Sequence, residues 1–266
     1  MLLKGKIACI TGSAKGLGKM TALALADLGC DVVINYVRSE QEGLDLAALI
    51  EAKGVRSMAV QADIAIREQA DNLIDTIEEQ WGASVDILVN NAGPFVRERR
   101  YFDEYSRDEI DYLMRGNLLG VMELDHRVLV GMQRKRWGRI IHFGFGHAAE
   151  ARGWPHRAVY AAAKVGLVSF TKTLAVEQAV HGITVNMICP GDIRGDNKEK
   201  TIEQVQDLPN EELPGVRPGS GEDIARVIAY LCLPHSDYLT GNIMDISGGF
   251  DPIRTLAEVP RERNQV

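Results

Sequence analysis

Tyr160 and Lys164 are the two side chains whose types and spacing best suit proton chemistry. They stand four residues apart in a segment, Val159–Val180, whose pattern predicts a helix, so both project from one helix face. A free tyrosine has a pKa of about 10 and is a poor acid or base near neutrality. A nearby ammonium stabilises the phenolate and lowers that pKa. The pair therefore predicts a tyrosine that exchanges a proton with a substrate oxygen.

A glycine-rich turn follows the first predicted strand, Ile7–Thr11, and opens the first predicted helix, Leu17–Leu28. Glycine is required in such a turn because the backbone adopts unusual dihedral angles and must approach a pyrophosphate closely at the helix N-terminus. The strand–turn–helix placement at the start of the chain favours a dinucleotide site over an ordinary tight turn. The residues of this turn that we expect to bind the cofactor are Gly12, Ser13, Lys15, Gly16, Leu17 and Gly18.

The elements that must position these residues alternate along the chain, with short β-branched runs between longer helical patterns. Further strands are predicted at Asp31–Tyr36, Val55–Gln61, Val85–Asn90, Arg139–Gly144, Thr184–Cys189 and Ile243–Ile246. Further helices are predicted at Glu40–Lys53, Arg67–Trp81, a long stretch ending near Arg136, and Gly221–Leu231. Apolar strands separated by helices indicate a parallel sheet covered on both faces. The sequence thus predicts an α/β fold, a single Rossmann-like doubly wound domain over residues 1–266.

Four motifs in this order resemble the short-chain dehydrogenase/reductase family over nearly the whole chain. They are the Gly-x-x-x-Gly-x-Gly turn, Asn90-Asn91-Ala92-Gly93, Tyr160-Ala161-Ala162-Ala163-Lys164, and Cys189-Pro190-Gly191, followed by a C-terminal signature at Thr240-Gly241 and Ser247-Gly248-Gly249. The nearest branch is the 3-oxoacyl-acyl-carrier-protein reductases. The resemblance implies NADPH-dependent reduction of a ketone to a secondary alcohol, first of all a 3-oxoacyl thioester, with Tyr160 as the proton donor.

The resemblance also implies roles for individual residues. Lys164 is expected to hold the nicotinamide ribose, and Asn117 to anchor a proton-relay water near it. Asp63 is expected at the adenine. The remaining residues expected to line the cofactor cleft are Ile64, Asn90, Ala92, Gly93, Pro190, Gly191 and Ile193.

The end of the second strand bears on which nicotinamide cofactor binds. An NAD-specific enzyme usually places an acid there to bond the ribose 2′-hydroxyl, but this strand ends without one. Lys15 and Arg38 could instead face a 2′-phosphate, since ammonium and guanidinium groups pair well with phosphate. The alternative is that both are solvated surface charges. We expect NADP(H).

The family's catalytic serine, which donates a hydrogen bond to the substrate oxygen, is absent: no serine stands between Gly138 and Tyr160. Alignment on the strand puts Phe145 in its place, whereas counting back from Tyr160 puts His147 there. We expect His147 to supply the donor, with a solvent-exposed loop histidine as the alternative. Losing one such donor typically costs about 10²–10³ in rate.

A second departure is Gly195, which stands where the family often has a threonine that bonds the nicotinamide carboxamide. Two other functions therefore stay open. One is a reductase or dehydrogenase of another small carbonyl or alcohol. The other is a weakly catalytic NADP(H)-binding protein with a regulatory role.

Composition narrows the remaining possibilities. The net charge of −7 offers no bulk attraction to nucleic acid or to an anionic membrane. Four widely spaced cysteines in apolar stretches predict buried free thiols and no metal site. No signal peptide and no apolar run of membrane-helix length are expected, so we expect a cytoplasmic protein. By resemblance we expect a homo-dimer or homo-tetramer, and Arg136 matches a position that docks acyl carrier protein.

Overall fold

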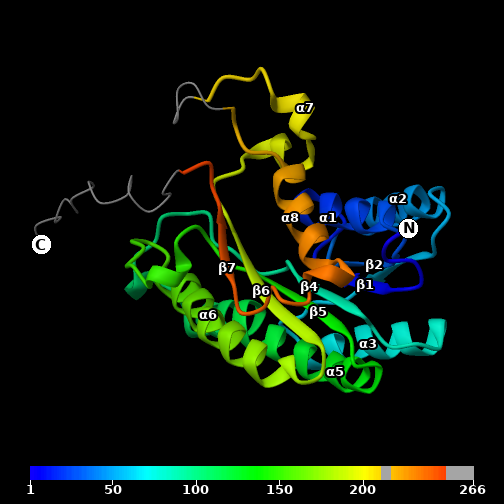
Figure 1. The fold of residues 1–266 in the computed structure, drawn as a ribbon. Coiled ribbons are helices and arrows are strands. Elements are labelled where there is room, and N and C mark those ends of the chain that lie inside the picture. The colour runs from blue at the N-terminus through cyan, green and yellow to red at the C-terminus, as the bar shows by residue number, and fades with distance from the viewer. Residues whose placement is uncertain (211–216, 250–266) are drawn as a thin grey trace, which may run out of the picture.

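The computed structural model of the chain describes residues 1–210 and 217–249, and their strands form one parallel sheet (Figure 1). The strand order is β3-β2-β1-β4-β5-β6-β7. From β1, the strands β2 and β3 extend the sheet on one side, and β4 to β7 then extend it on the other. The point of reversal, between β1 and β4, is the switch point where doubly wound sheets bind ligands. The predicted α/β doubly wound fold is confirmed. The strands are β1 Ile7–Ile10, β2 Asp31–Tyr36, β3 Ser57–Gln61, β4 Ile87–Asn90, β5 Gly138–Phe143, β6 Ile183–Pro190 and β7 Ile243–Ile246.

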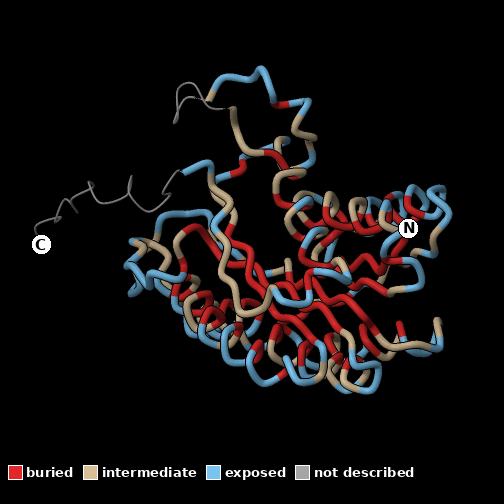
Figure 2. The backbone as a smooth tube through the Cα atoms, in the orientation of Figure 1, coloured by how far each residue is buried: buried red, intermediate tan, exposed pale blue. Residues whose placement is uncertain are grey.

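Helices cover both faces of the sheet (Figure 1). One face carries α1 Gly16–Asp27, α2 Glu40–Glu51 and α8 Gly221–Cys232, and the other carries α3 Arg67–Trp81, α5 Gly120–Lys135 and α6 Ala158–Ala179. Successive strand residues point to opposite faces, so Cys9 packs with α3 and α5 whereas Ile10 packs with α1 and α8. Figure 2 shows the buried residues concentrated in the sheet and on the helix surfaces turned toward it.

The structure differs from the sequence expectation mainly in two segments. The long helical stretch ending near Arg136 consists of α4 Arg107–Met114, a π-helical turn Arg115–Leu119 and α5. The loop after β6 holds a 3₁₀ turn, Gly195–Glu199, and the short α7 Ile202–Val205, and its residues 211–216 lie outside the described part. Elements this short give no measurable periodicity, which is why the sequence pattern did not predict them.

α6 corrects one expectation from composition. By length and mean hydropathy it is apolar enough to cross a membrane, although no such segment was expected. Half of that apolar stretch is buried inside the protein, as in the core helix of a globular domain. All four cysteines are buried and free, as predicted.

A buried polar chain links β4, β5, α5 and α6 beneath the carboxyl end of the sheet. Asp125 accepts hydrogen bonds from Asn90 Nδ2 at 2.8 Å and lies 2.8 Å from His142 Nε2. The Thr171 hydroxyl donates to the Leu167 carbonyl, so it can only accept from His142 Nδ1, 2.7 Å away. His142 Nδ1 therefore faces Thr171 while its Nε2 faces Asp125. The side chains of this histidine–aspartate pair are fully buried.

We predict that Asp125→Ala lowers the free energy of unfolding by about 3–5 kcal/mol, because it leaves buried polar partners without an acceptor. Urea denaturation measures the change. Asp71→Ala is the matched control, since Asp71 pairs with Arg127 on the surface and such pairs contribute at most about 1 kcal/mol. Equal losses in the two variants would contradict the prediction.

Candidate active site

The glycine-rich turn after β1 and the loop after β4 are hydrogen-bonded to each other. The Asn91 amide donates to the Thr11 carbonyl at 2.8 Å and to the Gly12 carbonyl at 3.0 Å, and the Ala92 N–H donates to Thr11 Oγ1 at 2.9 Å. A Cβ at Gly18 would lie 2.7 Å from Asn91 Nδ2. Gly12 has a φ of +61° and approaches Ala92 closely. Glycine is thus required at Gly12 by its backbone conformation and at Gly18 by close approach.

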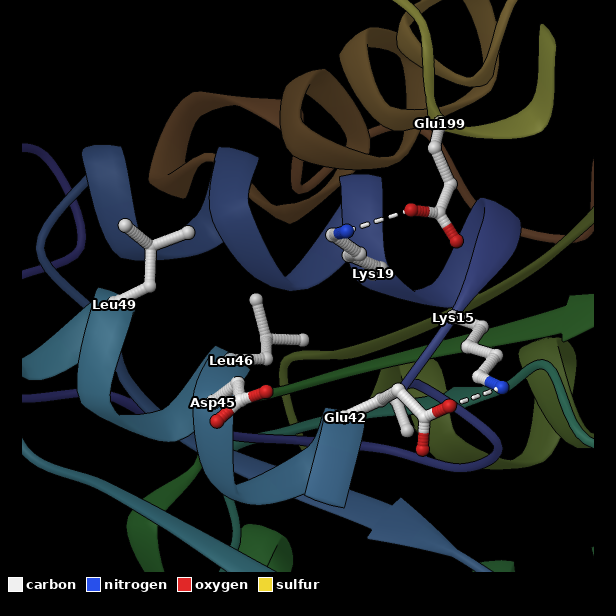
Figure 3. Close-up of a pocket in the computed structure, with 8 residues that line it drawn as sticks. Lys15, Lys19, Glu42, Asp45, Leu46, Leu49 and Glu199 are labelled. Atoms are coloured by element: carbon white, nitrogen blue, oxygen red, sulfur yellow. Dashed lines mark hydrogen bonds and ion pairs between the residues drawn. The ribbon is translucent and has the colours of Figure 1, made fainter. Parts of the chain in front are cut away.

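The N-terminus of α1 acts as an anion-binding group in this structure. The Gly16 N–H donates to Glu199 Oε1 at 2.8 Å, and Lys19 pairs with the other carboxylate oxygen at 2.6 Å (Figure 3). Partial burial raises the pKa of Glu199, but the Lys19 and Gly16 hydrogen bonds outweigh it and hold the pKa below its usual value. Helix N-termini favour anions through their free N–H groups and dipole. The same N–H group would suit a phosphate.

Lys15 lines the same cavity as Lys19 and Glu199, which has a volume of about 280 Å³ and lies between α1 and α2. Its ammonium pairs with Glu42 on α2 at 2.5 Å (Figure 3). Arg38 is exposed just after β2. The Asn35 side chain, at the end of the same strand, accepts from the Gly12 N–H at 3.1 Å, and Ser13 Oγ donates to the Ile10 carbonyl.

Asp63 and Ile64 follow β3. One Asp63 carboxylate oxygen accepts from the Ala65 N–H at 3.0 Å and the other from the Tyr112 hydroxyl at 2.9 Å. Ile64 is buried, and its carbonyl lies so close to α5 that a Cβ at Gly120 would be 2.1 Å from it. Asp63 is thereby fixed in orientation by a tyrosine from α4.

Asn117 lies at the middle of the π-helical turn between α4 and α5. Its amide nitrogen donates to the carbonyls of Pro94 and Leu113, at 2.8 and 3.0 Å. Its Oδ1 is buried and has no hydrogen-bond partner among the described residues. A Cβ at Gly93 would lie 2.3 Å from that oxygen and 3.6 Å from Lys164 Nζ. Asn117, Lys164 and Gly93 therefore converge, and π-helical turns often occur at such functional positions.

A cavity of about 510 Å³ lies where β4, β5 and β6 end. Of the predicted site residues, Leu17, Gly93, Asn117, Tyr160, Lys164, Pro190, Gly191 and Ile193 line it. Asn90 is buried in the polar chain beneath it. The predicted residues that do not line it are Gly12, Ser13, Lys15, Gly16, Gly18, Arg38, Asp63, Ile64, Ala92 and His147. Most of these lie toward the β1–β2 half of the same sheet edge, where a long, extended ligand would have to reach.

Burial dominates the electrostatics of Tyr160 and Lys164. Desolvation, and second the neighbouring Cys189 thiol, raise the pKa of Tyr160. Desolvation lowers the pKa of Lys164 to about 8, against a smaller opposing effect of Cys189. Lys164 Nζ is 5.8 Å from the centre of the Tyr160 ring. The expectation that the ammonium lowers the tyrosine pKa is wrong in this structure. The phenol stays protonated at neutral pH, which is the form that donates a proton.

Comparison with known proteins assigns the chain to a family. Residues 12–251 match the family model described as enoyl-(acyl carrier protein) reductase. The Bacillus subtilis protein YtkK is named as an oxidoreductase. It is 41% identical to this chain, and the match covers 92% of this chain and 96% of YtkK. A Staphylococcus epidermidis protein named 3-oxoacyl-[acyl-carrier-protein] reductase FabG is 36% identical over 92% and 98%. A blue fluorescent protein from a metagenomic library, solved in complex with NADPH, superposes with a TM-score of 0.80 at 32% identity over 94% and 99%.

The chain belongs to the short-chain dehydrogenase/reductase family. It is an oxidoreductase by that membership. The matched descriptions name an enoyl reductase and a 3-oxoacyl reductase, so they agree on a reductase and differ on the bond reduced.

The cavity wall distinguishes the two residues that the sequence offered for the place of the missing serine. Phe145 is buried, lines the cavity, and has its ring centre 6.1 Å from that of Tyr160. His147 does not line the cavity: its Nδ1 lies 2.7 Å from Glu150 Oε1, and its N–H donates to Asp245. The prediction of a substrate-facing His147 is therefore corrected. His147 has a left-handed φ of +63°, which turns the chain after the strand. Counting residues back from Tyr160 cannot reveal such a turn.

Several lining residues were missed from the sequence. They are Asn91, Phe95, Arg99, Arg157, Arg194 and Lys198. Asn91 belongs to a motif that was recognised, so its hydrogen bonds to the glycine turn could have been sought. The others come from the loops after β4, β5 and β6, and nothing in their local pattern fixes where these loops fold.

We predict that the Lys164 ammonium loses its proton near pH 8, because burial penalises its charge. It is then charged below that pH and neutral above it, while an ordinary lysine titrates near 10.5. NMR of the protein labelled with ¹³C at lysine Cε should show one resonance moving between pH 7 and 9, and Lys164→Met should remove that resonance. If all lysine resonances move only above pH 10, the burial argument is wrong.

Proposed function

We propose that this protein reduces a ketone to a secondary alcohol with NADPH, and that the ketone is a 3-oxoacyl thioester. The observation that carries the proposal is the cavity at the ends of β4, β5 and β6, where a protonated Tyr160 lies one helical turn from a buried Lys164. The FabG relative, whose name describes reduction of 3-oxoacyl groups on acyl carrier protein, supports the substrate class. The relative solved with NADPH supports the cofactor.

The described residues fit a dinucleotide. Gly12, Ser13, Gly16, Leu17 and Gly18 would hold the pyrophosphate, since Gly16 already donates to an anion. Asp63 and Ile64 would hold the adenine, while Asn90, Ala92 and Gly93 would form the floor under the ribose and nicotinamide. Pro190, Gly191 and Ile193 would close the far wall. Bound there, NADPH supplies a hydride to the carbonyl carbon.

The remaining steps belong to this chain's own side chains. The Tyr160 hydroxyl donates its proton to the oxygen of the reduced carbonyl. Lys164 carries a positive charge below about pH 8 and stabilises negative charge that develops beside it. Asn117 offers its unpartnered Oδ1 close to Lys164, where it would hold a water that returns a proton toward the tyrosine.

A weakly catalytic NADP(H)-binding protein is the second candidate, and Phe145 favours it. An aromatic ring cannot donate the hydrogen bond that the family's serine gives to the substrate oxygen. The two candidate functions are distinguished by measuring NADPH consumption with a panel of ketones and acetoacetyl thioesters, followed by the absorbance of NADPH. Rapid turnover with a thioester supports the first, and NADPH binding without turnover supports the second.

The proposal extends to partners and location. We propose a homo-dimer or homo-tetramer in the cytoplasm, with the substrate carried on acyl carrier protein. Arg136, at the exposed end of α5, is the proposed docking residue on this chain, and its guanidinium donates to the Val180 carbonyl at 2.8 Å. The net charge of −7 disfavours binding to nucleic acid and to an anionic membrane, so we propose neither as a partner.

We predict that Tyr160→Phe lowers kcat by roughly 10²–10⁴-fold, because it removes the proton donor and no bulk. The dissociation constant of NADPH should change less than about twofold, since the same substitution deletes only one hydroxyl. Steady-state kinetics and fluorescence titration measure the two. Tyr238→Phe, at a residue that is almost fully exposed, is the control and should leave both unchanged. Ordinary kcat in Tyr160→Phe would show that the proton comes from elsewhere.

We predict that NADPH binds roughly tenfold or more tightly than NADH, a difference of about 1.4 kcal/mol, because Lys15 and Arg38 can face a 2′-phosphate. Arg38→Asp should reverse much of that preference, since an acid there repels the phosphate and can bond a ribose hydroxyl. Arg134→Asp, an equal charge change at the end of α5, should leave the ratio of the two dissociation constants unaltered. Equal affinities for the two cofactors in the unmodified protein would defeat this prediction.

A further inference from the structure

The substrate oxygen in the proposed reaction needs a hydrogen-bond donor besides Tyr160. Negative charge that develops on that oxygen in a dry cavity is stabilised by preorganised donors, and one such donor is typically worth about 10²–10³ in rate. Phe145, which takes the serine's place in the alignment on the strand, lines the cavity, and His147 is turned away to Glu150. Either the reaction proceeds without the donor, or another group in the cavity wall supplies it.

Several donors in the cavity wall are already used within the protein. The Gly144 N–H donates to the Ile188 carbonyl in the sheet. The Arg157 guanidinium donates to the carbonyls of Arg97, Glu98 and His156. The Asn91 amide holds the glycine turn. None of these can turn to a substrate without breaking a structural bond.

The Trp154 indole N–H is different. Trp154 lines the cavity, and its Nε1 is buried with no hydrogen-bond partner among the described residues. Buried tryptophan N–H groups usually find a hydrogen-bond partner, and leaving one without a partner destabilises the fold. A polar atom kept in this state at a ligand cavity indicates that its partner is the ligand.

The position of the ring agrees with that reading. The Trp154 ring centre is 4.8 Å from that of Phe145 and 6.1 Å from that of Tyr160, which it meets nearly edge-on at 73°. The indole therefore packs against both the ring that replaces the serine and the ring that donates the proton. These three rings are packed together, so the indole is held beside the Tyr160 ring.

We propose that the Trp154 indole N–H donates a hydrogen bond to the substrate carbonyl oxygen, in the place of the serine that this chain lacks. Phe145 serves as the surface on which the indole rests. The loop between β5 and α6 brings Trp154 to that surface. The role rests on the proposed ketone reduction. Unlike a histidine, an indole does not titrate near neutrality, so its contribution is independent of pH across that range.

The test separates the N–H group from the ring. Trp154→Phe keeps an aromatic ring and removes the donor, and should lower kcat/KM for the ketone by roughly 10²-fold. Replacement of Trp154 by 3-benzothienylalanine, which keeps the shape of the indole but has sulfur in place of N–H, should lower it equally. NADPH affinity should stay within about twofold in both. Trp81→Phe, whose ring packs on Arg56 away from the cavity, is the control and should match the unmodified enzyme.

A serine restored beside the tryptophan provides a rescue. In a Phe145→Ser background, the added hydroxyl can donate in place of the indole, so Trp154→Phe should cost less than about threefold there. Full activity in the benzothienylalanine protein would overturn the proposal, because it would show that only the ring's shape matters. A loss in Trp154→Phe that benzothienylalanine restores would do the same.

Failure of the proposed function gives a different result. If the unmodified protein consumes no NADPH with any ketone, the reductase proposal fails. The indole is then tested by titrating acetoacetyl thioester into the protein–NADPH complex. A dissociation constant raised roughly threefold or more in the benzothienylalanine protein supports the N–H contact, since one neutral hydrogen bond contributes about 0.5–1.5 kcal/mol. An unchanged constant overturns it.

Discussion

The parallel pairing of β1 with β4 is the constraint on which the site depends. These strands are neighbours in the sheet although β2 and β3 separate them in the sequence. The helices that follow β1 and β4 therefore cover opposite faces of the sheet, and the loops after these two strands diverge at the sheet edge. The Asn91 amide then holds the loops together by donating to the Thr11 and Gly12 carbonyls. The glycine turn, Gly93 and the base of the cavity all take their positions from this pairing.

The same burial that stabilises the sheet sets the protonation states of the site. α6 is packed against the core along much of its length, so Lys164 is nearly inaccessible to solvent and loses affinity for its proton, while Tyr160 gains affinity. Both shifts have one physical cause, the cost of a charge in a medium that solvates it poorly. The result is a tyrosine whose phenol keeps its proton at neutral pH.

Aromatic packing replaces polar chemistry along one part of the cavity wall. Phe145, Trp154, Tyr160 and Phe95 form a continuous set of ring contacts around the cavity. Such contacts order side chains at low entropic cost. The polar groups of Trp154 and Tyr160 therefore keep fixed directions although none of the described serines lines this part of the cavity. The buried Asn90–Asp125–His142 chain does the same for the floor of the site from beneath.

The sequence by itself determined the order and type of the strands and long helices, the glycine turn, and the pairing of Tyr160 with Lys164 on one helix face. These follow from local periodicity and from motifs whose members are close in the chain, and β2, α3 and β7 were predicted to the residue. It left open which residue follows β5 into the cavity. That choice depends on the path of the loop 146–157, where His147 takes a left-handed conformation and Trp154 packs on Phe145. The pKa of Tyr160 was likewise decided only by the tertiary structure, because desolvation depends on everything packed around the phenol and the spacing of two residues records only their proximity.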